Sequence, residues 1–211
     1  MANKPLDTAL LDRAIVFAVR AHAGTERRGK GFPYIVHPME AVEIVATMTN
    51  DQELLAAAAL HDTVEDTSTT IEQIRAEFGD RVAELVAAES DEPHQSGDSI
   101  ENWRARKQAA IDRLTHAPLD TKMVALGDKL SNMRAIARDY AMQGDALWTL
   151  FHSKDRKDHE WHYRGLAKAL NDLRNTFAYK EFERLVEEVF APPQPFGPSV
   201  ANGDSLPFVG P

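Results

Sequence analysis

Apolar side chains recur three or four positions apart along most of the chain. In residues 8–22 this stripe follows Asp7, a residue type that caps helices, and consists of Leu10, Leu11, Ala14, Ile15, Ala18 and Val19. The same spacing predicts helices over residues 102–115, 119–138, 144–151, 157–173 and 179–190. Because strand-like alternation is not sustained anywhere, the pattern predicts an all-α fold of about eight to ten helices.

Local signals predict where further helices begin. A helix opens near His37, which is followed by a proline of the kind tolerated in a first turn. Asn50 with Glu53, and Thr69 with Glu72, have the spacing of a capping box, in which each side chain bonds the other residue's backbone amide. The first pair stands directly before an apolar run, and the second before a helix that we expect to end near Gly79, so we expect a helix to start at each.

The positions of loop-forming segments along the chain predict one domain. Residues 24–33 and 90–100 are polar and contain glycine or proline, which indicates loops within that domain. From residue 191 onward the chain contains six prolines and three glycines, a composition typical of a tail. We therefore expect a single domain over residues 1–190 and a tail over residues 191–211, with no internal repeat.

Composition narrows the class of protein. With 24 basic and 33 acidic residues the formal net charge is −9, which opposes binding to the phosphate backbone of a long nucleic acid. No apolar run has the length of a membrane span, and the start lacks a signal-peptide pattern, so we expect a cytoplasmic protein without a membrane partner. Cysteine is absent, so any metal site must use imidazole and carboxylate groups. The oligomeric state stays open.

The candidate chemistry is concentrated in the segment LHDTVEDT, residues 60–67. His61 and Asp62 are adjacent and can converge on one ion at a helix end. Glu65 and Asp66 follow within about one helical turn, so the four groups share one flank if the helical path continues. Groups that ionise this close together repel or neutralise one another unless a cation lies among them.

Two further positions can complete a metal site. His37 opens a predicted helix, and Asp128 lies within a long one. Asn132 follows Asp128 by four residues and therefore shares its helical face. Singly, each has an ordinary structural explanation, a polar helix start for His37 or a surface ion pair for Asp128. Together, His37 and Asp128 supply the further ligands that a metal site built on His61 and Asp62 needs.

These motifs resemble a known family. The order His37, His61-Asp62, Asp128 is that of the HD-domain phosphohydrolases. More narrowly, RRGKGFPYIVHP at 27–38, LHDTVEDT at 60–67 and LGDKLSNMR at 126–134 resemble the RelA/SpoT hydrolase domain, and within it the stand-alone small alarmone hydrolases. The resemblance covers residues 8–170. It implies a single HD-type helical domain and a Mn²⁺-dependent enzyme that removes the 3′-pyrophosphate from guanosine tetra- or pentaphosphate.

The resemblance also implies roles for individual residues. The metal ligands would be His37, His61, Asp62 and Asp128. The catalytic pair would be Glu65 and Asp66. The substrate contacts would come from Arg27, which stacks on the base, from Arg28, which reaches phosphate, and from Asn132, Ser131, Lys107, Lys157 and Tyr163. Four other histidines fit no ligand spacing and are expected at the surface, namely His94, His116, His152 and His159.

Other functions compete with this one. The family's synthetase module would follow the hydrolase domain, but only about twenty residues follow position 190, so we expect no alarmone synthesis. A broader nucleotide phosphatase, acting for instance on the 2′-phosphate of NADPH, needs the same kind of pocket and stays open. A domain that binds alarmone without hydrolysing it is disfavoured, because all the expected ligands and both Glu65 and Asp66 are present.

Overall fold

The computed structural model describes residues 7–27, 29–90 and 99–191. Within them the chain is helical, and the pairing of Glu26 with Pro33 is an isolated bridge rather than part of a sheet. The all-α prediction, with eight to ten helices, is confirmed for this part of the chain. None of its helices has the length and apolarity needed to cross a membrane. The predicted tail falls almost wholly outside the described residues, so the division at residue 190 stays a prediction.

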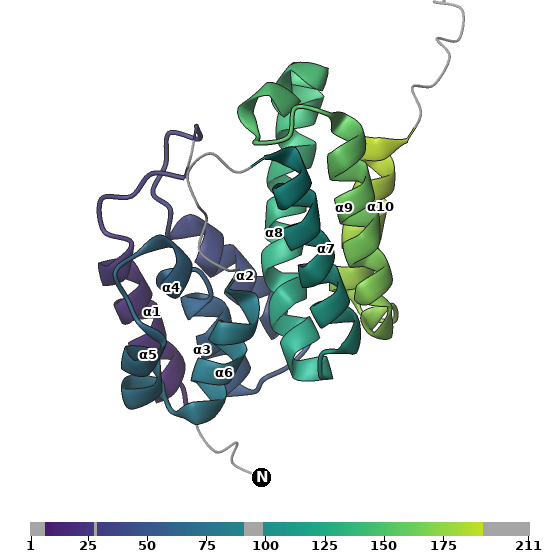
Figure 1. Ribbon diagram of the computed structural model, residues 1–211. Helices are drawn as coiled ribbons and strands as arrows, with labels where there is room; N and C mark the ends of the chain where they lie inside the picture. The colour runs from purple at the N-terminus through teal and green to yellow at the C-terminus, as the bar shows by residue number, and fades with distance from the viewer. Residues whose placement is uncertain (1–6, 28, 91–98, 192–211) are drawn as a thin grey trace, which may run out of the picture.

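The elements follow one another in two groups (Figure 1). The first group contains α1 (Ala9–Ala21), α2 (Val36–Ala46), α3 (Gln52–Leu60), α4 (Thr63–Asp66), α5 (Ile71–Phe78) and α6 (Asp80–Glu89). The second contains α7 (Ile100–His116), α8 (Leu119–Gln143), the 3₁₀ helix η1 (Gly144–Leu150), α9 (Arg156–Ala169), the 3₁₀ helix η2 (Asn171–Leu173) and α10 (Phe177–Phe190).

Helix α3 is the centre of the first group. All its residues from Leu54 to Leu60 are buried, and the run Ala56–Ala59 is fully inaccessible. Small side chains allow α1, α2, α6 and α8 to contact this one helix. Its exit therefore lies at a meeting point of several helices, and that exit carries His61.

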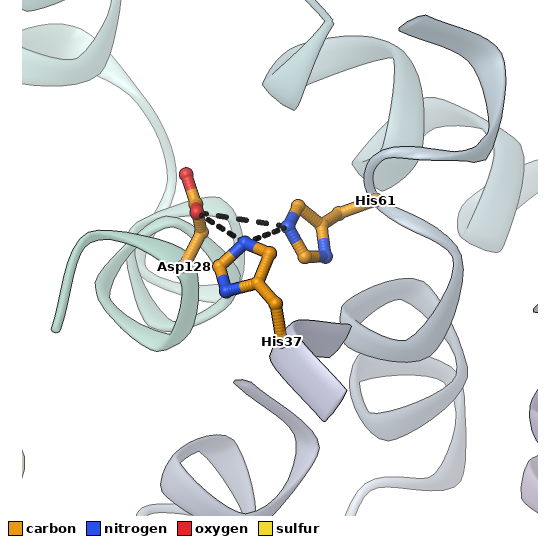
Figure 2. A group of neighbouring side chains, drawn as sticks. All are labelled: His37, His61 and Asp128. Atoms are coloured by element: carbon orange, nitrogen blue, oxygen red, sulfur yellow. Dashed lines mark hydrogen bonds and ion pairs between the residues drawn. The ribbon is translucent and has the colours of Figure 1, made fainter. Parts of the chain in front are cut away.

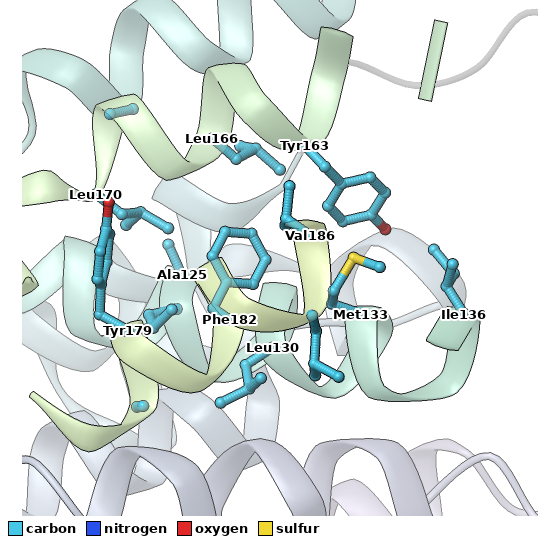
Figure 3. Packing of buried hydrophobic residues seen from close by; sticks show 14 of the residues in the cluster. Ala125, Leu130, Met133, Ile136, Tyr163, Leu166, Leu170, Tyr179, Phe182 and Val186 are labelled. Atoms are coloured by element: carbon cyan, nitrogen blue, oxygen red, sulfur yellow. The ribbon is translucent and has the colours of Figure 1, made fainter. Parts of the chain in front are cut away.

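The second group packs around α8 and α10. Buried side chains of α8 such as Leu130 and Met133 meet Phe182 and Val186 of α10 and Leu166 of α9 (Figure 3). Helix α8 also contacts α2 and α3, and its Val124 belongs to the core of the first group. Helix α8 is thus shared by both cores and holds the two groups together.

Close packing of α8 on α2 depends on a glycine. A Cβ atom at Gly127 would lie 2.7 Å from Cγ2 of Val45 and 3.0 Å from the carbonyl oxygen of Ala41. Both neighbours belong to α2, and one of them is backbone. Glycine at this position therefore lets the two helices approach next to Asp128, the residue that follows it.

Several helix boundaries differ from the predictions. The second capping box is formed by Thr70 and Gln73, one residue later than predicted. The cap of α3 is Asp51, whose side chain accepts from the amide of Glu53 without a reciprocal bond. The predicted helix 157–173 is interrupted at Leu170, where α9 ends and η2 begins. The two helix starts depend on which neighbouring polar side chain accepts from the free amides.

Candidate metal centre

The candidate ligands come from four places in the first two-thirds of the chain. His37 lies in the first turn of α2, and His61 directly follows α3. Asp62 directly precedes α4 without a side-chain capping bond, and the amide of Asp66 bonds the Asp62 carbonyl at 2.9 Å, so the helical path nearly continues here. Asp128 lies on α8. Figure 2 shows the two imidazole rings and the Asp128 carboxylate pointing toward one another between these helices.

The ligand atoms converge closely. The Nε2 atoms of His37 and His61 are 3.3 Å apart. Oδ1 of Asp128 lies 3.1 Å from Nε2 of His37 and 3.6 Å from that of His61. Oδ2 of Asp62 lies 3.3 Å and 3.0 Å from the same two nitrogens. The structure thus brings together the four residues that the sequence nominated.

Hydrogen bonds behind the two rings decide which nitrogens face this point. Nδ1 of His61 bonds the carbonyl of Ala58 at 2.8 Å, which requires the proton on Nδ1. Nδ1 of His37 bonds the hydroxyl of Ser131, also at 2.8 Å. Both rings therefore turn Nε2 toward the carboxylates, the arrangement found for histidines that ligate a metal.

The two carboxylates are held from behind as well. Asp128 accepts from Lys129 at Oδ2 and from the amide of Asn132 at Oδ1, each at 2.5 Å. The hydroxyl of Tyr34 donates to Oδ2 of Asp62 at 2.7 Å. Burial opposes ionisation of Asp128, but Lys129 and the two histidines hold its pKa well below the usual range.

The charges within the cluster stabilise one another. Burial lowers the pKa of His61, but the Asp62 and Asp128 carboxylates outweigh it and raise the pKa well above the usual value. The same contacts hold the pKa of Asp62 below its usual range despite burial. In the absence of a cation the site therefore retains a proton between its nitrogens and oxygens, and a cation must displace that proton.

These residues fit a divalent cation. Ligand atoms at right angles and about 2.1 Å from one ion are about 3 Å apart. The observed separations of 3.0 to 3.6 Å lie in that range, and His37, His61 and Asp128 offer atoms all within 4.8 Å of one another. Imidazole with carboxylate suits Zn²⁺, Mn²⁺ or Fe²⁺ and does not select one of them.

The acidic pair follows Asp62 by three and four residues. Glu65 and Asp66 end the short helix α4, and both are exposed, so a substrate can reach them. Burial and the neighbouring carboxylates of Asp62 and Asp66 together raise the pKa of the Tyr34 phenol. Carboxylates of this kind can hold or deprotonate a water, so the pair stays a candidate for that role.

A pocket of about 630 Å³ opens next to the cluster and runs along α8. Arg27, Tyr34 and Asn132 form its near end, while Leu147 and Phe151 are among its apolar walls. Nη2 of Arg27 donates to Oδ1 of Asn132 at 2.5 Å, and its guanidinium lies 5.2 Å from the ring centre of Tyr34. The pocket therefore offers a cation, an amide and an apolar wall beside the candidate metal ligands.

The other predicted substrate contacts are placed differently. Tyr163 lines the same pocket from α9, although most of its ring is buried in the second core. Ser131 is buried, and its hydroxyl bonds His37 and Glu40 instead of facing the pocket. Lys107 is half-buried on α7 and Lys157 exposed on α9, and neither lines this pocket. Arg28 lies outside the described residues.

Tyr34 and His22 are among the residues near the cluster that the sequence analysis missed. Tyr34 donates to Asp62, as described above. His22 is buried and stacks on Tyr34 with ring centres 4.8 Å apart, and neither of its ring nitrogens has a hydrogen-bond partner among the described residues. A signal existed, because His22 continues the buried stripe of Ala14 and Ala18 at intervals of four.

One prediction about the remaining histidines is wrong. His159 is buried, stacks on Trp148 with ring centres 5.0 Å apart and bonds the Ser153 carbonyl through Nε2. Its polar edge is satisfied by backbone, so an apolar environment tolerates it. His116 and His152 are exposed as predicted, and His94 lies outside the described residues.

Comparisons with known proteins agree with this arrangement. The sequence profile of the HD domain matches residues 14–155. Over 135 residues the chain is 36% identical to human guanosine-3′,5′-bis(diphosphate) 3′-pyrophosphohydrolase MESH1, a match that covers 63% of this chain and 72% of the human protein. Over 140 residues it is 33% identical to guanosine-3′,5′-bis(diphosphate) 3′-pyrophosphohydrolase of Aquifex aeolicus, covering 64% of this chain but only 19% of that protein.

Solved structures share the fold. The protein lmo0812 of Listeria monocytogenes superposes with a TM-score of 0.63 at 29% identity, over 73% of this chain and 98% of its own. A metazoan ortholog of SpoT, described as hydrolysing ppGpp, superposes with a TM-score of 0.65 over 89% of this chain and 98% of its own. At 23% identity this second likeness shows the fold alone.

Proposed function

Because this chain belongs to the HD domain family, we propose that it is a metal-dependent phosphohydrolase that removes the 3′-pyrophosphate of guanosine tetra- or pentaphosphate. The observation that carries the proposal is the convergence of His37, His61, Asp62 and Asp128 beside a pocket of nucleotide size. The substrate is the one for which the human and Aquifex relatives are named.

We assign the metal to these four ligands and propose Mn²⁺ as its identity. A divalent cation in such a site lowers the pKa of a bound water and offsets charge on the phosphoryl oxygens. The protein holds the ligands in place through hydrogen bonds with Ala58, Ser131, Lys129 and Tyr34 behind them.

Glu65 and Asp66 are the proposed catalytic pair. Their carboxylates hold the attacking water and accept its proton. The water oxygen bonds to the phosphorus on the 3′-oxygen, the bond between that phosphorus and the 3′-oxygen breaks, and the 3′-oxygen takes up a proton. The products are pyrophosphate and GDP from the tetraphosphate, or pyrophosphate and GTP from the pentaphosphate.

The proposed substrate contacts fall into two groups. Arg27 and Asn132 lie at the near end of the pocket, where they suit the base and the ribose or phosphate, and Tyr163 lines its wall. Arg28, Lys107 and Lys157 are proposed as cations for the phosphates on the evidence of the sequence motifs. Ser131 acts on the site through its bond to His37.

A small nucleotide is the proposed partner, and the cytoplasm is the proposed place where the two meet. The net charge of −9 opposes a long nucleic acid in the same role, because binding of that kind depends on neutralising many phosphates. A local group of cations beside a pocket serves a single nucleotide without that requirement.

The test is incubation with Mn²⁺ and each of guanosine tetraphosphate, guanosine pentaphosphate and NADPH, followed by identification of the products. Release of pyrophosphate with GDP or GTP would establish the proposed reaction. Orthophosphate released from NADPH alone would establish the broader phosphatase instead. Tight binding of the guanosine nucleotides without any product would identify a binding module.

A further inference from the structure

A chain of side-chain hydrogen bonds begins at His37 and leads away from the candidate metal centre. Nδ1 of His37 lies 2.8 Å from Oγ of Ser131, and that hydroxyl donates to Oε2 of Glu40 at 2.7 Å. A serine hydroxyl has one proton and gives it to the carboxylate, so toward His37 it can only accept. The bond therefore requires the proton of His37 to be on Nδ1.

The chain continues to the last helix. Nη1 of Arg134 donates to Oε1 of Glu40 at 3.2 Å. Nε and Nη2 of the same guanidinium donate to the two carboxylate oxygens of Glu181 at 2.8 and 2.7 Å. Side chains of Glu40, Arg134 and Glu181 are 24%, 26% and 33% exposed, so solvent screens these charges incompletely. The path crosses from α2 through α8 to α10.

We propose that Ser131, Glu40 and Arg134 are positioning residues of the metal centre, and that they set the affinity for the cation by keeping Nε2 of His37 free and aimed at the site. The inference rests on the proposed metal centre and is independent of which nucleotide is hydrolysed. It assigns Ser131 a role behind the ligand instead of in the substrate pocket.

The two ligand histidines differ in how they are held. His61 is oriented by the carbonyl of Ala58, a backbone group that no substitution removes. His37 is oriented by a side chain, and that side chain in turn by a carboxylate and a guanidinium. The geometry of His37 is therefore the part of the site that substitutions away from the ligands can alter.

The experiment measures Mn²⁺ affinity, by the electron paramagnetic resonance signal of free Mn²⁺, at a temperature where circular dichroism shows each variant folded. Ser131→Ala should weaken binding about 10–100-fold, the usual effect of losing a group that orients a ligand. Glu40→Gln should weaken it in the same direction, because the neutral amide holds the serine proton less strongly.

The matched control is Glu43→Gln. Glu43 lies on the same helix, 3.7 Å from Arg134, and its side chain is 65% exposed. The substitution removes the same charge as Glu40→Gln without touching Ser131. Equal loss of affinity in the two glutamate variants would reduce the effect to a change of net charge and overturn the proposal. A larger loss in Glu40→Gln supports it, even if Ser131→Ala does not fold.

A second readout does not need the metal. Two-dimensional ¹H–¹⁵N spectra of the histidine rings, recorded on metal-free protein, report which ring nitrogens carry a proton. His37 should carry a proton on Nδ1 in the unmodified chain, and the fraction of molecules with that proton should fall in Ser131→Ala. If the unmodified chain binds no Mn²⁺, the metal proposal fails while these spectra still decide the orientation. An unchanged tautomer together with unchanged affinity would refute the role of Ser131.

Discussion

Replacement of Gly127 by alanine tests whether the close approach of α2 and α8 sets the geometry of the metal centre. The new Cβ atom would lie 2.7 Å from Cγ2 of Val45 and 3.0 Å from the Ala41 carbonyl oxygen. Carbon atoms in ordinary contact are about 3.5–4.0 Å apart, so the helices must separate locally by about 1 Å. His37 lies on α2 and Asp128 on α8, and their 3.1 Å contact has to lengthen.

The expected loss of stability is small because two terms oppose each other. Overpacking of a core costs about 1–3 kcal/mol, while alanine in place of glycine in a helix contributes about 1 kcal/mol. The net loss of up to about 2 kcal/mol lowers Tm by at most about 8 °C in a chain of this size. The effect on the site is larger, since a misplacement of about 1 Å reduces turnover about 100-fold.

Gly165→Ala is the control for this experiment. A Cβ atom there would also lie 2.7 Å from a neighbour, but that neighbour is the terminal carbon of Ile111, between α9 and α7. The two variants are compared by thermal unfolding, Mn²⁺ affinity and turnover at saturating Mn²⁺. We expect a change in Tm no larger for Gly165→Ala, because the end of the Ile111 side chain can move, with loss of affinity and turnover confined to Gly127→Ala. If Gly127→Ala retains full affinity and rate, or Gly165→Ala loses as much, the packing argument is refuted.

Three further predictions concern the chemistry. Glu65→Gln should keep Mn²⁺ bound while turnover falls about 100-fold or more, as measured by metal content and pyrophosphate release; loss of the metal would instead make Glu65 a ligand or a support. Arg27→Ala should raise KM for guanosine tetraphosphate about 2- to 30-fold. Hydrolysis of a phosphate ester without a base should be almost unaffected. Equal loss of activity on both substrates would assign Arg27 to phosphate binding or to support of the site. Mn²⁺ affinity should fall as pH falls from about 8 to about 6, because the raised pKa of His61 lets protons compete with the cation. Calorimetric titration with Mn²⁺ across this range measures the direction of the change. An affinity independent of pH would contradict the prediction.

The convergence of the candidate site was predictable because its residues are polar groups in positions that would otherwise be buried and unpaired. His61 follows the buried apolar run Leu54–Leu60, and Asp128 interrupts the buried face of α8, so each needs a partner. The order of the motifs along the chain then indicated that these residues belong to one site. That they act as metal ligands, and which of their neighbours touch substrate, stays a prediction.

Other features depended on contacts that only the folded chain defines. The sequence motif places Ser131 among the candidate pocket residues. Its position around helix α8 instead turns its side chain toward His37 and Glu40. His159 lies in a segment rich in charged residues. It is nevertheless covered by Trp148, from the preceding 3₁₀ helix, and by Phe151, at the end of that helix. Sequence spacing gives the face of a helix and leaves open which neighbour covers that face.

The alanine run of α3 has a consequence for how the sequence can vary. Ala56, Ala57, Ala58 and Ala59 are all fully inaccessible, and four helices contact the segment that contains them. Any larger side chain needs volume that the surrounding helices do not leave, and each addition displaces the helix whose end carries His61. In a saturation mutagenesis of the whole chain, these positions should accept only glycine and serine, and selection for activity should be as strict here as at the ligands themselves.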